Sequence, residues 1–240
     1  MGIIDWILLL VLAITTWCVA SDGVWGAAIT FVGSLIAGLI AMNFFEPLAR
    51  FMGSNILTGY YWDMRWDIIA LLGLFAGGIF LLRAIGEKLL PTYAETKPLM
   101  HDIGRWVFGL ATGYVVTGVV LTALHTAPLP REFLGFEPER ANLFDIAAPD
   151  RHWLGFTQYV SEKALARSSN GRIVGFDTVE FHSNPDDPNS LTKWSSFPIR
   201  YAARREQFGR GGQATSPNST TSPPPPTVTP APTSGGSTGF

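Results

Sequence analysis

The sequence predicts an all-α membrane protein in which four transmembrane helices form a bundle. An irregular polar region with one amphipathic helix follows, and then a disordered tail. Three observations predict this fold class: four apolar stretches occupy the first 125 residues, the second half is polar enough to hold mean hydropathy at +0.22, and the chain ends in a run of Gly, Ser, Thr and Pro. A hydrocarbon core about 30 Å thick needs roughly 20 apolar residues in a helix. The expected domains are therefore residues 1–127 in the membrane, a juxtamembrane region at 128–208, and a tail at 209–240.

The first two apolar stretches are expected to form a helical hairpin. Ile3 to Ala20 carries one charge, at Asp5, and Val24 to Phe45 carries none. Residues 18–20 faintly resemble a signal-peptide cleavage site, but residues 1–6 lack the basic start that such a peptide needs, so we expect a retained helix. The intervening Ser21-Asp22-Gly23 is a turn-forming trio that predicts two antiparallel neighbours.

The third and fourth stretches are uncharged over Ile68–Leu82 and Trp106–Leu124. The segment from Glu46 to Asp67, which precedes the third, holds a proline, two glycines and an aromatic cluster, Tyr60, Tyr61, Trp62 and Trp66. Tyr and Trp are typical of the membrane–water interface, so this segment is expected to be a connection at that level. The segment from Arg83 to Arg105 is the charged connection between the last two helices.

Orientation in the membrane follows from basic residues near the helix ends. One side of a four-helix protein would hold the connection at 83–105, with four basic residues, Arg83, Lys88, Lys97 and Arg105. The other side would hold Arg50, Arg65, Arg131 and Arg140. The numbers are equal, but concentration in one connection favours a cytoplasmic position for it. We expect a multi-pass protein of the bacterial inner membrane with both termini extracytoplasmic.

The polar region contains one predicted helix and one predicted strand. Asp150 to Arg167 reads as an amphipathic helix lying on the membrane surface, with its apolar side formed by Trp153, Phe156, Val160 and Ala164. Ile173–Phe181 has the composition of a short strand. From Gly209 the composition cannot bury enough apolar surface to offset the entropy of ordering, which predicts disorder.

Small residues recur four positions apart on three of the apolar stretches, and positions four apart share a helix face. Small side chains allow helix backbones to approach closely in lipid. Packing within one bundle explains such faces, and contact with a second copy or with another membrane or envelope protein is the alternative. The predicted packing residues are Gly33, Ala37, Gly73, Gly77, Gly109, Gly113 and Thr117.

Three charged residues near the membrane are candidate polar sites: Asp5, Asp102 and Arg105. A carboxylate near the start of a membrane helix is costly unless it reaches the interface, a partner or water. Asp5 is either stabilised by the helix dipole and wetted by headgroups, or makes a polar contact inside the bundle with a backbone group or a basic side chain.

The sequence argues against several classes of chemistry. The nearly balanced charge, −2 at pH 7, gives no footprint for nucleic acid. The lone cysteine and the wide spacing of the four histidines exclude zinc-finger and zincin patterns, and we expect ordinary surface or interfacial histidines. Neither a nucleophile elbow nor a phosphate-binding loop is present. We therefore expect no enzyme, no catalytic residue, no metal and no cofactor, and the lipid bilayer as the surrounding partner.

The first half of the chain resembles the colicin V production protein family. The resemblance rests on an apolar start with an early acidic residue, on a tight turn with a glycine opening the second helix, and on an acidic residue before a last helix with glycines four apart. These motifs are Ile3-Ile4-Asp5-Trp6-Ile7, Asp22-Gly23-Val24-Trp25-Gly26, Asp102-Ile103-Gly104-Arg105 and Phe108-Gly109-Leu110-Ala111-Thr112-Gly113.

The resemblance implies four membrane helices and a role in toxin production or export, or in cell-envelope homeostasis, without an established chemical activity. Some relatives carry a protease domain, but Pro128–Phe208 shows no nucleophile motif. The leading hypothesis is a non-enzymatic accessory that acts through helix–helix contacts. The alternative is a small oligomeric channel or transporter with Asp5 in a polar interior.

Overall fold

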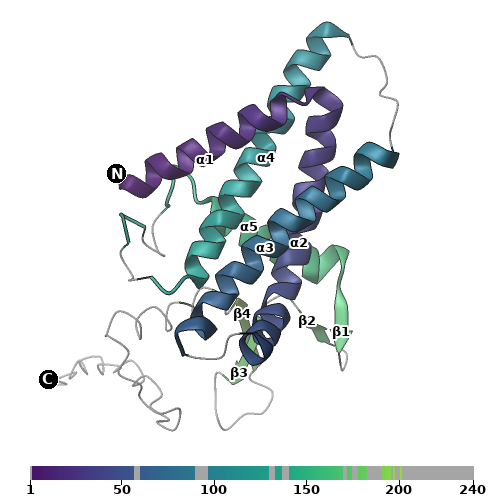
Figure 1. Cartoon of the computed structure of the whole chain (residues 1–240). Coiled ribbons are helices and arrows are strands. Elements are labelled where there is room, and N and C mark those ends of the chain that lie inside the picture. Colours follow the sequence, from purple (N-terminus) through teal and green to yellow (C-terminus); the bar gives the residue numbers. More distant parts are fainter. Residues whose placement is uncertain are drawn as a thin grey trace, which may run out of the picture.

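The computed structural model describes residues 2–56, 60–89, 97–129, 133–136 and 141–169, the segments 172–174, 178–182 and 191–195, and residues 197 and 201. Its main elements are four long helices: α1 (Ile3–Ala20), α2 (Gly23–Asn55), α3 (Tyr60–Leu89) and α4 (Pro98–Thr126) (Figure 1). Each contains a stretch long and apolar enough to cross a membrane. The predicted four-helix membrane fold is confirmed. The predicted tail at 209–240 lies outside the described residues.

Helix α1 packs mainly against α4 rather than returning along α2. The turn at residues 21–22 is the predicted one, and Gly23 takes φ +78° there, a conformation that favours glycine. Beyond the turn α1 and α2 diverge (Figure 1). Close approach of α1 to α4 depends on two glycines: a Cβ on Gly109 would lie 2.9 Å from the Thr16 carbonyl oxygen, and one on Gly113 would lie 2.9 Å from that of Leu12. Because α1 packs on the small-residue face of α4, α1 and α2 do not form the close antiparallel pair that was predicted.

Helices α2 and α3 form the most extensive pair in the structure, and both extend beyond their predicted apolar stretches. The segment at 46–67 was expected to be a connection, but helix occupies most of it despite Pro47 inside α2. Phe45, Ala49 and Trp66 are all buried in one apolar cluster with the rest of the pair. Tertiary packing thus lengthens helices whose composition becomes polar at the membrane edge.

Helix α5 (Pro149–Tyr159) is the predicted amphipathic helix, and it packs against α4 and α2. Its buried side is Asp150, Trp153 and Thr157, whereas Phe156 and Ala164 of the predicted apolar side are exposed. The rotation has a steric cause, because Gly38 leaves room for the Trp153 ring and Gly118 for the Pro149 carbonyl and the Trp153 Cβ. The helix is therefore docked on the bundle through Trp153 and presents Phe156 and Tyr159 outward.

Beyond α5 the described polar region is short and irregular. The helix continues as one π-helical turn (Val160–Ala164), closed by the Leu165 amide donating to the Val160 carbonyl. Two antiparallel hairpins follow, β1 (Arg167–Ser169) with β2 (Arg172–Val174) and β3 (Thr178–His182) with β4 (Leu191–Ser195). The strand predicted at 173–181 is thus divided between β2 and β3.

Candidate functional site

A buried ion pair joins the end of α4 to the start of α5. His125 Nε2–H donates to Asp150 Oδ2 at 2.9 Å, and the two side chains are 4% and 1% exposed. Because an ionised carboxylate only accepts, Nε2 carries the proton. The Phe136 ring meets the imidazole edge to face at 5.2 Å, and Asp150 Oδ1 is buried without a hydrogen-bond partner among the described residues. A pair so withdrawn from water is expected to be costly to break.

The pair corrects the expectation that all four histidines are ordinary surface or interfacial residues. His125 belongs to the last turn of α4, one residue before the buried Thr126, so it ends a membrane helix instead of lying beyond it. Asp150 follows Pro149 in the first turn of α5, where the helix dipole favours a carboxylate. Sequence periodicity does not predict a contact between His125 and Asp150, which are 25 residues apart. The available signal was that His125, a polar residue, directly follows the fourth apolar stretch.

Asp5 makes a contact inside the bundle at the start of α1. Its side chain is fully buried, with Oδ2 accepting from the Gly2 backbone N–H at 2.7 Å and Oδ1 from that of Phe144 at 3.3 Å. The first bond caps α1, and the second ties α1 to the segment that leads into α5. Of the two sequence-based interpretations, this geometry corresponds to the polar contact with backbone groups, not to a carboxylate wetted by headgroups.

The starts of α1 and α5 and the end of α4 form a single corner of the molecule. Ile4, Leu8, Leu121 and Phe136 share one buried apolar cluster there. Asp5 follows Ile4 of this cluster directly along α1, and the His125–Asp150 pair adjoins the cluster through the Phe136 ring. We call Asp5, His125 and Asp150 the polar corner. Its groups join helices to one another and to the following segment.

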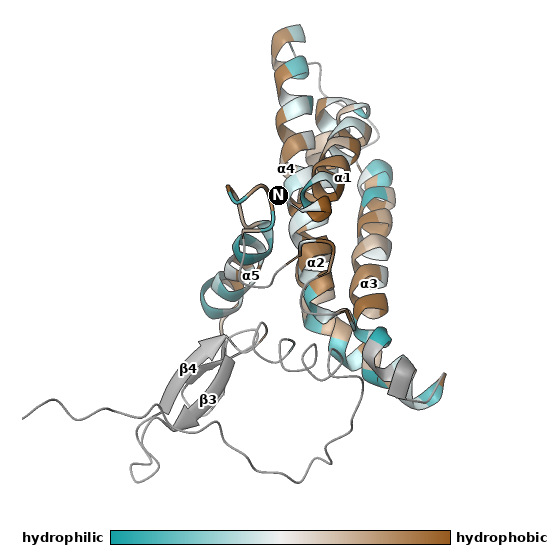
Figure 2. Ribbon diagram, turned by 90° about the vertical axis from the view of Figure 1, so that its left-hand side faces the viewer, coloured by the Kyte–Doolittle hydropathy of each residue, from teal (hydrophilic) through white to brown (hydrophobic). Residues whose placement is uncertain are grey.

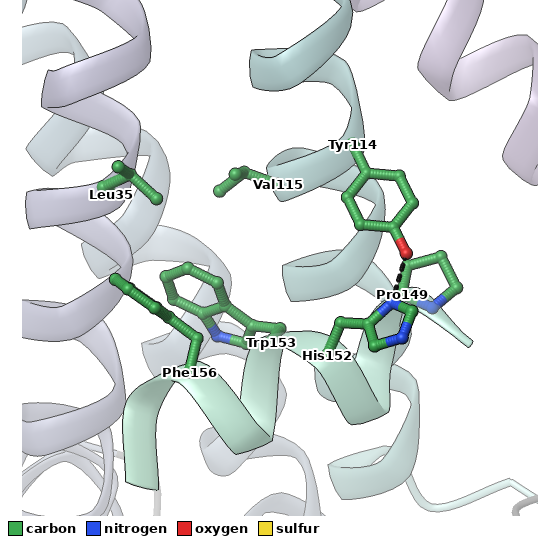
Figure 3. Close-up of a pocket in the computed structure, with 7 residues that line it drawn as sticks. All are labelled: Leu35, Tyr114, Val115, Pro149, His152, Trp153 and Phe156. Carbon is green, nitrogen blue, oxygen red and sulfur yellow. Dashed lines mark hydrogen bonds between the residues drawn. The ribbon is translucent and has the colours of Figure 1, made fainter. Parts of the chain in front are cut away.

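A second polar contact links α5 to the middle of α4. The Tyr114 hydroxyl is hydrogen-bonded to His152 Nδ1, and Figure 3 shows the two side chains meeting beside Pro149. Next to this contact lies a cavity of about 150 Å³ between α2, α4 and α5. Its walls are Leu35, Val115, Trp153 and Phe156, with Tyr114, Pro149 and His152 on one side.

Ion pairs also fix the opposite end of the bundle. Arg83 of α3 reaches Asp22 in the α1–α2 turn at 2.7 Å and Glu87 at 2.9 Å, a cluster that sequence reasoning missed because Asp22 was taken only as a turn residue. The predicted polar residues Asp102 and Arg105 pair with each other at 3.2 Å on the exposed surface of α4. Trp17 and Trp106 stack edge to face at this level, as expected of a membrane interface.

Most of the predicted packing residues lie between helices of the bundle. Gly33 and Ala37 of α2 face α3, where their neighbours are Leu82 and Gly78. Gly109 and Gly113 of α4 face α1, and Thr117 is buried with its hydroxyl donating to the Gly113 carbonyl at 2.8 Å. These positions are occupied within one chain and leave no free face.

Gly73 and Gly77 of α3 are placed differently. Both are exposed, and a Cβ on either would meet no atom within 4 Å. Around them on the outer side of α3 stand Ile69, 42% exposed, and Phe80, 78% exposed. We call Ile69, Gly73, Ala76, Gly77 and Phe80 the outer face of α3. Only 17% of the apolar stretch of α3 is buried, compared with 50% for α4, and α3 lies at the edge of the bundle in Figure 2.

Within the described part of the chain, no three His, Cys, Asp or Glu side chains converge in a way that could hold a metal ion. The buried titratable groups of the polar corner are engaged with backbone amides or with each other. The structure therefore has two notable features. Hydrogen bonds of the polar corner join helices to one another, and the outer face of α3 allows close approach of another helix.

Comparison with known proteins identifies the family. Residues 4–140, more than half of the chain, match the family described as colicin V production protein. No curated protein and no solved structure gave a match. The matched segment covers the four membrane helices except Ile3, and it includes Asp5 and the outer face of α3, whereas Gly2 and Phe144, whose amides donate to Asp5, lie outside it. The chain therefore belongs to the colicin V production protein family.

Proposed function

We propose that this protein is a non-enzymatic membrane accessory in colicin V-type toxin production or export, or in envelope homeostasis. It acts by holding another membrane helix against the outer face of α3. The observation that carries the proposal is the placement of Gly73 and Gly77 one turn apart, exposed, with open space over both. Family membership supports the toxin-related role, and the outer face supplies the mode of action.

The physical argument rests on what small residues do in lipid. Lipid tails are as apolar as leucine, so helices associate there through close packing and not through the hydrophobic effect. Paired glycines let two backbones approach, and Ile69 and Phe80 on either side of the two glycines provide dispersion contacts. The other small-residue faces are already filled inside the bundle, which leaves this one for a second copy or another membrane protein.

The test replaces Gly73 and Gly77 together by leucine. A Cβ at either position meets no atom within 4 Å, so the leucines should leave folding intact. They should weaken association of a second helix with the outer face of α3 by about tenfold or more, about 1.4 kcal/mol. Size-exclusion chromatography with light scattering in mild detergent measures assembly, and secreted toxin or envelope integrity measures function.

Two variants control this experiment. Gly155→Leu makes the same change at another glycine with nothing within 4 Å, on α5, and should leave assembly intact. Gly113→Leu drives a side chain into the α1 backbone and should lower bundle stability itself. Unchanged assembly and unchanged phenotype in the Gly73→Leu, Gly77→Leu variant would contradict the proposed mode of action.

We further propose an inner-membrane location with both termini extracytoplasmic. The support is the concentration of Arg83, Lys88, Lys97 and Arg105 around the α3–α4 connection. In a Cys18→Ser background, Ser216→Cys should react with an impermeant thiol reagent in intact cells, whereas Thr92→Cys should react only after lysis. The reverse labelling pattern would place the termini in the cytoplasm.

A further inference from the structure

The α2 and α4 walls of the cavity come from the middle of two predicted membrane spans. Leu35 belongs to the uncharged run at 24–45 and Tyr114 and Val115 to the run at 106–124. At 1.5 Å per residue, about 12 Å or more of helix separates each of them from either end of its run. These two walls therefore belong to the apolar part of the spans, and the amphipathic helix α5 packs across them.

The cavity is a short slot between α2 and α4, with α5 as its floor (Figure 3). On the same two helices Phe31 and Phe108 lie together, with ring centroids 6.0 Å apart. In the floor, the Trp153 ring occupies the space over Gly38, and the Trp153 Cβ lies against Gly118. The remaining walls are Leu35, Val115 and Phe156, and Phe156 is 37% exposed, so on this side the slot reaches the outer surface.

Size and chemistry select the occupant. A cavity of about 150 Å³ lined by apolar side chains accepts a benzene-sized group, which is too small for a helix and large enough for a few methylene groups. The Tyr114 hydroxyl and His152 Nδ1 are hydrogen-bonded to each other at its edge, and the other polar group on its lining is Trp153 Nε1, which is buried without a hydrogen-bond partner among the described residues. An amphipathic helix with exposed Phe156 and Tyr159 also suits the boundary between headgroups and acyl chains.

We infer that this slot binds a segment of one acyl chain of a membrane lipid. The chain enters past Phe156 and packs between Leu35 and Val115 on the Trp153 ring. A bound chain contacts α2, α4 and α5 at once, so it would stabilise the docked position of α5 by mass action. The inference is independent of the outer face of α3, which lies on another helix.

Photo-crosslinking in native membranes tests this inference. Cells are fed a fatty acid carrying a diazirine near its methyl end, the membranes are irradiated, and the adducts of the full-length protein are mapped by mass spectrometry. Adducts on the α5 peptide holding Trp153 and Phe156 should exceed those at Leu10 and Phe44 by at least fivefold. These two control residues lie outside the lining of this cavity and are 59% and 57% exposed.

Filling the slot should remove the excess. Val115→Phe should reduce adducts on the α5 peptide to the level of the controls, whereas Val107→Phe, a matched change at a residue 57% exposed on the same helix, should not. Leu35→Phe with its control Ile36→Phe repeats the test from the opposite wall, so that loss of folding in one variant does not decide the result. Two results would overturn the inference: adducts on the α5 peptide at the level of the controls in the unmodified protein, or an excess of adducts that persists in both filling variants.

Discussion

Replacing His125 with alanine is expected to release α5 from the bundle at a cost of about 3–5 kcal/mol, because it leaves the Asp150 carboxylate buried without a partner. Asp150 is 1% exposed and has one oxygen already lacking a hydrogen bond among the described residues, so no neighbour stands ready to replace the imidazole. Limited proteolysis within α5 and thermal unfolding in detergent measure the effect.

Two further variants identify the cause of the expected loss of stability. His101→Ala removes a histidine whose side chain is 42% exposed and should change stability by less than about 0.5 kcal/mol. The double variant His125→Leu, Asp150→Leu removes the imidazole and the carboxylate together and should recover much of the lost stability, because apolar residues of similar volume replace a buried pair well. Equal proteolysis of α5 in the His125→Ala variant and the unmodified protein would show that the pair does not hold the helix.

Replacing Trp153 with alanine should have a similarly large effect, about 3–5 kcal/mol. Trp153 is 4% exposed, its ring lies against Gly38 and its Cβ against Gly118, and neither glycine has a side chain that could fill the space left by the ring. The variant should also open the floor of the slot between α2 and α4. Unfolding followed by circular dichroism measures the change, with Tyr159→Ala, at a residue 62% exposed on the same helix, as the control. A loss no greater than that of the control would mean that α5 is not docked through this ring.

The sequence was sufficient for the number of membrane helices because that number depends on a local property, the length of apolar runs. Helix pairing was not predictable in the same way. The short turn at 21–23 suggested α1 beside α2, whereas α1 follows α4 because Gly109 and Gly113 admit its backbone. The extension of α2 to Asn55 also depends on contacts between distant residues, because Phe45 and Ala49 share a buried apolar cluster with Trp66 of α3.

The polar corner shows the same division. Asp5 could be identified from sequence, because an acidic residue near the start of an apolar helix is unusual. Its partner could not, since the Phe144 amide carries no side-chain signal. The rotation of α5 depends on Gly38 and Gly118, which belong to two other helices, so helical periodicity within residues 150–167 predicted the buried Trp153 but wrongly placed Phe156 and Ala164 on the same side. The small-residue stripes were visible in sequence, but only the structure separates the occupied faces from the free one at Gly73 and Gly77.

We expect the outer face of α3 to contact another membrane protein helix in the cell. The most direct measurement places the photoreactive amino acid benzoylphenylalanine at Phe80, which is 78% exposed on that face, and irradiates native membranes. Phe44 of α2, 57% exposed, is the matched control. A protein adduct of dimer size or larger should form from position 80 and be abolished by Gly77→Leu, and no such adduct should form from position 44. Lipid adducts alone at both positions would show that no protein helix contacts this face.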